Sequence, residues 1–204
     1  ETVACLRQMG VKCVEVTGGG EPTVYPHFDE LVQAIADAGM DMALVTNGPL
    51  LTPERAKLLG RLPFVWVRVS IDAGTAEAYA HVRNVPLLHW ARAWDAVALL
   101  SAQKRRPGAH PESTVGVGFV IDRSNWHDVF AACRLAKEAG ADNIRISASF
   151  TPDGMSRFEA GCFTAVPAQI ARAKAALEDE TFHVNDLSVE RWHNLEAPTQ
   201  TYGF

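Results

Sequence analysis

The residues with the most distinctive chemistry lie in segment 16–27, where an apolar run gives way to three consecutive glycines and a single carboxylate. The three glycines, Gly18–Gly20, lose more backbone freedom on ordering than other residues would, so they favour neither helix nor strand. We expect bare backbone here because a ligand approaches it closely. Glu21, which Pro22 restricts to an extended conformation, is the charge placed to meet that ligand.

The composition indicates an ordinary globular domain. The 204-residue chain is 48% hydrophobic and 21% charged, with a formal net charge of −5, and this is enough apolar material for a core. Its basic residues are scattered, so we expect no nucleic-acid partner. The apolar runs are far shorter than the roughly 20 residues of a membrane span, so we expect no membrane partner.

The cysteines and histidines lack the spacing of a metal site. The four cysteines form neither a C-x-x-C pair nor a disulfide framework, which favours a reducing, cytoplasmic location. We expect neither Cys5 nor Cys13 to bind a metal, because seven residues separate them and they lie on a helix and at the start of a strand. We assign no role to His27, His81 and His127.

Hydrophobic periodicity predicts strands that alternate with helices. The expected strands are 13–17, 42–46, 65–72, 115–121 and 143–147, with a short one at 182–184. The expected helices are 3–9, 28–39, 52–62, a segment carrying Trp90 and Trp94, one ending at Gly140, 167–177 and 187–195. A loop is expected around Tyr79 and His81, and a turn at 151–154. This alternation implies consecutive βαβ units and a parallel sheet.

Two of the expected strands have one aliphatic and one polar face. In 65–72 the valines and Ile71 alternate with Trp66, Arg68, Ser70 and Asp72. An open sheet and a barrel both satisfy the pattern, but a polar inner face favours a curved sheet with a lumen.

Other inward positions carry charges or lack side chains. Glu15, Arg68 and Arg145 could form a buried ion-pair network there, which we take as structural rather than catalytic. Gly116 and Gly118 leave room on the same face. In either architecture the chemistry belongs at the carboxyl ends of the strands.

Three motifs at successive strand ends carry a family resemblance. Gly19-Gly-Glu-Pro22, Thr46-Asn-Gly48 and Ser70-Ile-Asp72, in this order, resemble the radical S-adenosylmethionine (radical SAM) enzymes. The resemblance implies an α/β fold, a partial (βα)6 TIM-like barrel of parallel strands. The N-terminal βα unit would be truncated, so that strands two to six are visible. Residues 1–180 would form the radical SAM core, and 181–204 a linker toward a C-terminal extension.

The resemblance also implies the cofactors, S-adenosylmethionine and a [4Fe–4S] cluster. The C-x-x-x-C-x-x-C motif that holds the cluster would lie upstream of Glu1, so its ligands are not expected here. The implied cofactor-binding residues are Gly19, Gly20 and Glu21 for the ammonium, Ser70 and Asp72 for the ribose or methionyl group, Arg83 for the carboxylate, and Asn47. Gly116 and Gly118 loosely resemble a small-residue strand beside the adenine.

Each assignment has a plainer structural alternative. The glycine loop could be a tight turn, Ser70 and Asp72 a strand-end network, and Asn47-Gly48 a turn dipeptide. Arg83 could be a surface residue, and packing could account for Gly116 and Gly118 equally well.

The implied activity is generation of a 5′-deoxyadenosyl radical that abstracts hydrogen from a small-molecule or peptide substrate. An electron donor such as flavodoxin or ferredoxin would be a partner, and the chain alone would be inactive. Two alternatives remain: a non-catalytic barrel module that has lost the cluster, and a phosphate-binding (βα) barrel enzyme. Glu21 argues against the second, because a carboxylate in the loop repels phosphate.

Overall fold

The computed structural model describes residues 1–106, 112–149, 158 and 161–188. Its centre is a six-stranded sheet in which every neighbouring pair is parallel. The strands are β1 (Cys13–Val16), β2 (Asp41–Thr46), β3 (Phe64–Ser70), β4 (Thr114–Ile121), β5 (Asn143–Ala148) and β6 (His183–Asp186). The helices are α1 (Thr2–Gln8), η1 (Pro22–Val24), α2 (Phe28–Asp37), α3 (Pro53–Leu59), α4 (Ala76–Arg83), α5 (Leu88–Lys104), η2 (Trp126–Asp128), α6 (Val129–Glu138) and α7 (Cys162–Leu177).

The order of the strands decides between the two architectures. They run β1-β2-β3-β4-β5-β6 across the sheet, so each strand lies beside the next one in the chain. A doubly wound open sheet reverses its order at a switch point, whereas a barrel adds strands consecutively. The predicted fold class, α/β with parallel strands in a partial barrel, is confirmed. The barrel is open, and the short strand expected at 182–184 is present as β6, next to the five strands that the resemblance numbers two to six.

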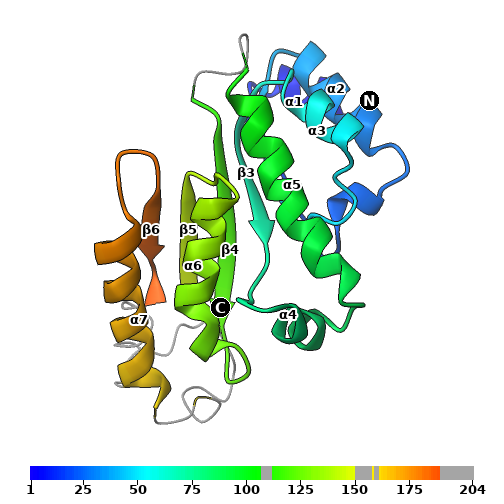
Figure 1. Cartoon of the computed structure of the whole chain (residues 1–204). Coiled ribbons are helices and arrows are strands. Elements are labelled where there is room, and N and C mark those ends of the chain that lie inside the picture. Colours follow the sequence, from blue (N-terminus) through cyan, green and yellow to red (C-terminus); the bar gives the residue numbers. More distant parts are fainter. Residues whose placement is uncertain (107–111, 150–157, 159–160, 189–204) are drawn as a thin grey trace, which may run out of the picture.

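Helices cover the aliphatic face of the sheet. Figure 1 shows α5, α6 and α7 in front of β3 to β6. Val69 and Val117 are fully buried and belong to the same core as Val97 of α5 and Ala132 of α6. Each such burial of a valine or isoleucine stabilises the fold by about 1.5–3 kcal/mol. The predicted alternation is therefore correct, with Val67, Val69 and Ile71 buried and Trp66, Arg68 and Ser70 half-buried on the other face.

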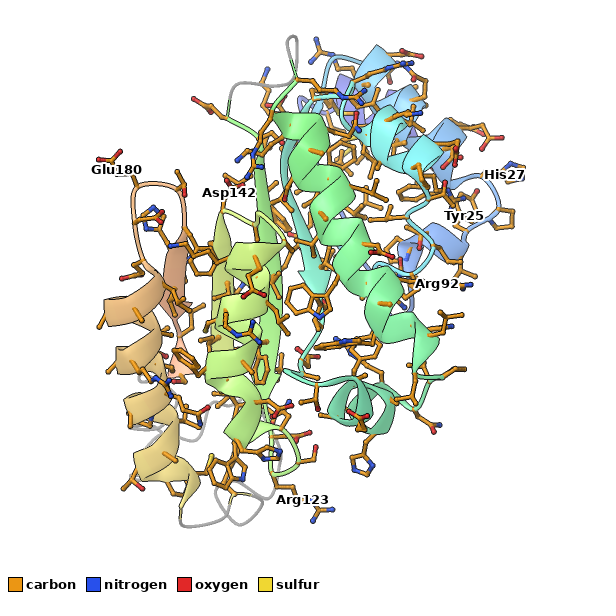
Figure 2. All side chains as sticks on the ribbon, viewed as in Figure 1. Tyr25, His27, Arg92, Arg123, Asp142 and Glu180 are labelled. Atoms are coloured by element: carbon orange, nitrogen blue, oxygen red, sulfur yellow. The ribbon has the colours of Figure 1, made fainter. Side chains whose placement is uncertain are left out.

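The carboxyl ends of the strands meet at one end of the molecule. In Figure 2 Arg123, just after β4, lies at the lower end, and Asp142, just before β5, lies at the opposite end. The loops that follow β1, β2 and β3 therefore belong to the lower end, where α4 is also found in Figure 1.

Three expected elements differ from the structure. Residues around Tyr79 and His81 form α4 rather than a loop, because Thr75 caps the first turn by accepting a hydrogen bond from the Ala78 N–H at 3.2 Å. Helix α7 begins at Cys162 and contains Pro167 instead of starting there. Strand β3 ends at Ser70, two residues earlier than expected.

Two expectations lie wholly or largely outside the described residues, namely the turn at 151–154 and the helix at 187–195. The expected boundary after residue 180 falls just before β6, which pairs with β5 in the same sheet. In the part of the chain that the structure describes, no helix combines the length and the apolar character that crossing a membrane requires.

Candidate functional site

The Glu21 carboxylate fastens the glycine loop to the end of the neighbouring strand. Its Oε1 accepts hydrogen bonds from the Thr23 N–H at 3.0 Å, the Thr23 hydroxyl at 2.5 Å and the Thr46 hydroxyl at 2.6 Å. Its Oε2 accepts one from the Asn47 N–H at 2.6 Å. Because Oε2 makes a single bond, it retains acceptor capacity for a further donor. The motifs after β1 and β2 are therefore joined through one carboxylate.

The loop preceding Glu21 is bare. A Cβ built on Gly19 or on Gly20 would meet nothing within 4 Å, and one on Gly18 would meet only the Gly20 nitrogen at 4.0 Å. None of the three adopts a positive φ. Neither packing against the described residues nor backbone conformation therefore requires glycine here.

Asn47 supplies a further acceptor beside Glu21. Its side-chain oxygen is buried and has no hydrogen-bond partner among the described residues. A buried amide oxygen without a donor is costly, which makes it a candidate contact for a bound ligand.

Gly48 is required by both conformation and space. Its φ is +94°, and a Cβ would lie 2.9 Å from Val69 Cγ1 and 3.2 Å from Ala93 Cα. Its N–H donates to the Thr46 hydroxyl at 3.1 Å. The Asn47-Gly48 pair is therefore a turn that packs against α5. The same turn positions the Asn47 N–H to donate its hydrogen bond to Glu21.

Asp72 and Arg83 bind each other. Asp72 has a left-handed backbone, with φ of 57°, and is 8% exposed. Its Oδ2 accepts from Arg83 Nη2 at 2.5 Å and its Oδ1 from the Val120 N–H at 2.7 Å. Burial raises the pKa of this carboxyl, while Arg83 and the Val120 N–H act in the opposite direction. Both oxygens are engaged in joining β3, β4 and α4, and Arg83 keeps a buried Nε without a partner among the described residues.

Sequence reasoning missed two residues that support these strand ends. Asn125 is fully buried, and its amide donates to the carbonyls of Asp72 and Val120, each at 2.9 Å. Asp128 Oδ2 accepts from the Gly74 N–H at 3.0 Å. Their only sequence signal is their position in the loop and first helical turn that follow a predicted strand, where polar residues gather in parallel α/β folds.

Glu21 with Asn47 forms one group of predicted residues and Asp72 with Arg83 the other, and charges from both groups act on Tyr79 of α4. Burial raises the pKa of the Tyr79 hydroxyl, Arg83 lowers it, and Asp72 and Glu21 raise it further. Ser70 lies on the polar face beside Gly118, and its hydroxyl makes no hydrogen bond within the described residues. The structure thus places Glu21 with Asn47 and Asp72 with Arg83, and leaves the hydroxyl of Ser70 available.

The interior glycines have packing reasons. A Cβ on Gly116 would lie 2.6 Å from Asn143 Oδ1, and one on Gly118 would lie 3.3 Å from Arg68 Cδ. The missing side chains therefore make room for those of Asn143 and Arg68. Packing accounts for the two glycines better than a cofactor contact does.

The cysteines divide by burial. Within the described ranges, no three His, Cys, Asp or Glu residues gather in a way that could hold a metal ion. Cys5 and Cys13 are exposed, whereas Cys133 and Cys162 are buried. Burial raises the pKa of the Cys133 thiol to about 12, so it is chemically inert near neutral pH.

The strand order and the polar residues gathered at the strand ends define a partial (βα) barrel whose candidate functional residues line its mouth. Comparison with known families then identifies the class of protein. The sequence model of the radical SAM superfamily matches residues 1–136, and the chain belongs to that superfamily.

Individual relatives agree with this membership. The chain is 30% identical over 130 residues to the AdoMet-dependent heme synthase of Methanosarcina barkeri, covering 64% of this chain and 35% of the synthase. It is 41% identical over 79 residues to the mycofactocin maturase MftC of Mycobacterium tuberculosis, covering 39% of this chain and 20% of the maturase.

A solved structure shares the fold. Streptococcus suis SuiB superposes with a TM-score of 0.68 at 12% identity, covering 100% of this chain and 46% of the SuiB chain. SuiB has also been solved bound to S-adenosylmethionine and bound to precursor peptide SuiA. The chain spans less than half the length of each of these three relatives.

The residues present fit S-adenosylmethionine, the cofactor that the family implies. Its ammonium needs acceptors, and the site offers the carbonyls of a bare glycine backbone, the remaining capacity of Glu21 Oε2 and the unpartnered Asn47 oxygen. Its ribose needs hydrogen-bonding groups, and the Ser70 hydroxyl is available. The described residues do not fit a [4Fe–4S] cluster, because they contain no set of three cysteines close together.

Proposed function

We propose that this chain is the S-adenosylmethionine-binding part of a radical SAM enzyme. Bound beside a reduced [4Fe–4S] cluster whose ligands lie outside this chain, the cofactor supplies a 5′-deoxyadenosyl radical that abstracts hydrogen from a substrate. The observation that carries the proposal is the open backbone of Gly19 and Gly20 beside Glu21 and Asn47. Superfamily membership supports it.

Each residue at the mouth has a specific part in this proposal. The carbonyls of Gly19 and Gly20 and the free capacity of Glu21 Oε2 accept hydrogen bonds from the ammonium of the cofactor, and Asn47 Oδ1 adds a further acceptor. Ser70 bonds the ribose or the methionyl group. Asp72 and Arg83 hold each other and keep α4 against the strand ends, with Arg83 Nε directed to the cofactor carboxylate.

A peptide substrate is the form of the proposal that the comparisons favour. SuiB has been solved with precursor peptide SuiA, and MftC is named a maturase. The heme synthase among the relatives keeps a small-molecule substrate open. A one-electron donor such as flavodoxin or ferredoxin completes the proposed system.

The test uses full-length, cluster-loaded protein. Gly19→Ala adds one methyl group where the fold has open space, so it should leave the melting temperature unchanged and weaken S-adenosylmethionine binding about tenfold. Glu21→Ala should weaken binding as well, by removing an acceptor and releasing the loop. The matched control is Glu30→Ala, which removes an exposed carboxylate from α2.

Equilibrium dialysis measures the affinity, and 5′-deoxyadenosine release on reduction measures the reaction. Unchanged affinity in both Gly19→Ala and Glu21→Ala would contradict the assigned site. Tight binding without any 5′-deoxyadenosine would favour the non-catalytic module.

A further inference from the structure

Two arginines occupy the concave face on either side of a glycine strand. Arg68 on β3 pairs in register with Gly116 of β4, and Arg145 on β5 pairs with Gly118 of the same strand. The stem of Arg68 crosses over Gly118, since a Cβ there would lie only 3.3 Å from Arg68 Cδ. Strand β4 therefore presents no side chain at these two positions to separate the two cations.

Neither guanidinium has an anionic partner in the described part of the chain. Among these residues, no ion pair within 4.0 Å and no hydrogen bond involves Arg68 or Arg145, and Arg68 Nε is buried without a partner. The Arg68 guanidinium instead stacks over the Trp66 ring, 4.7 Å from its centroid. The ion-pair network expected from the sequence is therefore not formed by these residues.

The local electrostatics leave an excess of positive charge. Burial, followed by the like charge of Arg145, lowers the pKa of Arg68, and Glu15 opposes this as the smallest of the three influences. Glu15 lies on β1, two strands away from Arg68, and is exposed. Two half-buried arginines side by side, the first of which has a lowered pKa, are an arrangement expected where an anion binds.

The position of the two arginines relative to the mouth suggests that the anion belongs to the substrate rather than to the cofactor. Arg68 lies two residues before Ser70, so it is one row deeper in the barrel than the residues assigned to the cofactor. A group held between the arginines would therefore lie one row below the residues assigned to the cofactor. A planar guanidinium fork matches an oxyanion, and a glycine-lined strand lets that anion approach.

We propose that Arg68 and Arg145 bind an oxyanion of the substrate, a carboxylate or a phosphate, on the floor of the partial barrel. This inference rests on the proposed function for the presence of a substrate, but its anion site can be tested independently. Trp66 supports the site by holding the Arg68 guanidinium in place.

The test is calorimetric titration of the full-length protein with succinate and, separately, with inorganic phosphate. We expect saturable binding of at least one anion, weakened about tenfold or more in Arg68→Gln and in Arg145→Gln. The matched control, Arg92→Gln, removes an exposed arginine of α5, which covers the opposite, aliphatic face of the sheet, and should bind as the wild type does. The anion that binds more tightly identifies the substrate group as a carboxylate or a phosphate.

Two further measurements distinguish an anion site from a structural ion pair and from a cofactor contact. Arg145→Gln should not lower the melting temperature, because it removes like-charge repulsion; a clear decrease would reveal a structural ion pair and overturn the inference. S-adenosylmethionine affinity should be unchanged in both variants, and a parallel loss would assign the arginines to the cofactor instead. Anion binding equal to that of the wild type in both variants would also overturn the proposed anion site. If wild-type protein binds the anions but not S-adenosylmethionine, the proposed function fails while the anion site stands.

Discussion

Replacing Gly48 with alanine should destabilise the fold more than any comparable change in the neighbouring glycine loop. The backbone φ of +94° disfavours a residue with a Cβ, and the added atom would lie 2.9 Å from Val69 Cγ1. It would also lie 3.2 Å from the Cα of Ala93, a backbone atom of α5 that cannot rotate away. The chain must therefore shift α5 or the turn to accommodate one methyl group.

The expected magnitude is the sum of two costs. A left-handed conformation costs a non-glycine residue about 1–2 kcal/mol, and overpacking a dense core costs about 1–3 kcal/mol. Together these give a loss of about 2–5 kcal/mol, which lowers the melting temperature of a domain of this size by about 4–20 °C. Val69→Ala removes one of the close contacts. The double variant should therefore lose about 1 kcal/mol less free energy of unfolding than the two single variants lose together.

The measurement is urea unfolding followed by circular dichroism, with Gly19→Ala as the matched control. Gly19 has open space and no positive φ, so that variant should stay within about 0.5 kcal/mol of the wild type. Equal stability of Gly48→Ala and wild type would refute the steric argument. So would equal destabilisation by the two alanine substitutions.

Two other predictions concern titration and reactivity. Hydrogen bonds from Lys137 and Thr181 hold the pKa of Asp179 well below its ordinary value. The Asp179 carboxylate therefore contributes fully to the stability of the fold above about pH 4, and this contribution is lost as the pH falls through the lowered pKa. Asp179→Asn should therefore be less stable than wild type at pH 6, and the difference in urea midpoint should narrow at pH 3; a constant difference would contradict this. For the cysteines, iodoacetamide at pH 8 should label Cys5 first, then Cys13, whose pKa is raised by burial and nearby carboxylates, and should leave Cys133 unlabelled in the folded protein. Mass spectrometry of the digested protein reads the order, and early labelling of Cys133 would show that its helix opens.

The sequence predicted the sheet well because strand periodicity is a local property. The alternation in 65–71 correctly separated the buried face from the half-buried face carrying Arg68. The same alternation predicted that the strand continues to Asp72, and this prediction was wrong because β3 ends at Ser70. The left-handed turn at Asp72 depends on bonds to Val120 and Arg83, which are 48 and 11 residues away, and no local pattern records such partners.

The candidate site was predicted in part. The motifs located the residues at the correct strand ends, but they gave Glu21 one role where the structure shows that its carboxylate also bonds Thr46 and Asn47. That pairing could have been expected, since β1 and β2 are neighbours and both end there. Helix α4 was missed because its sole buried residue is Tyr79, so it lacks a clear apolar stripe.

The carboxylates at the mouth also bear on how such a barrel can be altered. Glu21 ties the first loop to the second strand, Asp72 ties the end of the third strand to the fourth, and Asp128 reaches back to the loop containing Gly74. These loops are therefore not interchangeable modules, because exchanging one by grafting would leave an acidic side chain of its neighbour without donors. New specificity would have to be introduced by exchanging loops in adjacent pairs, or by changing residues on the sheet floor that no loop holds.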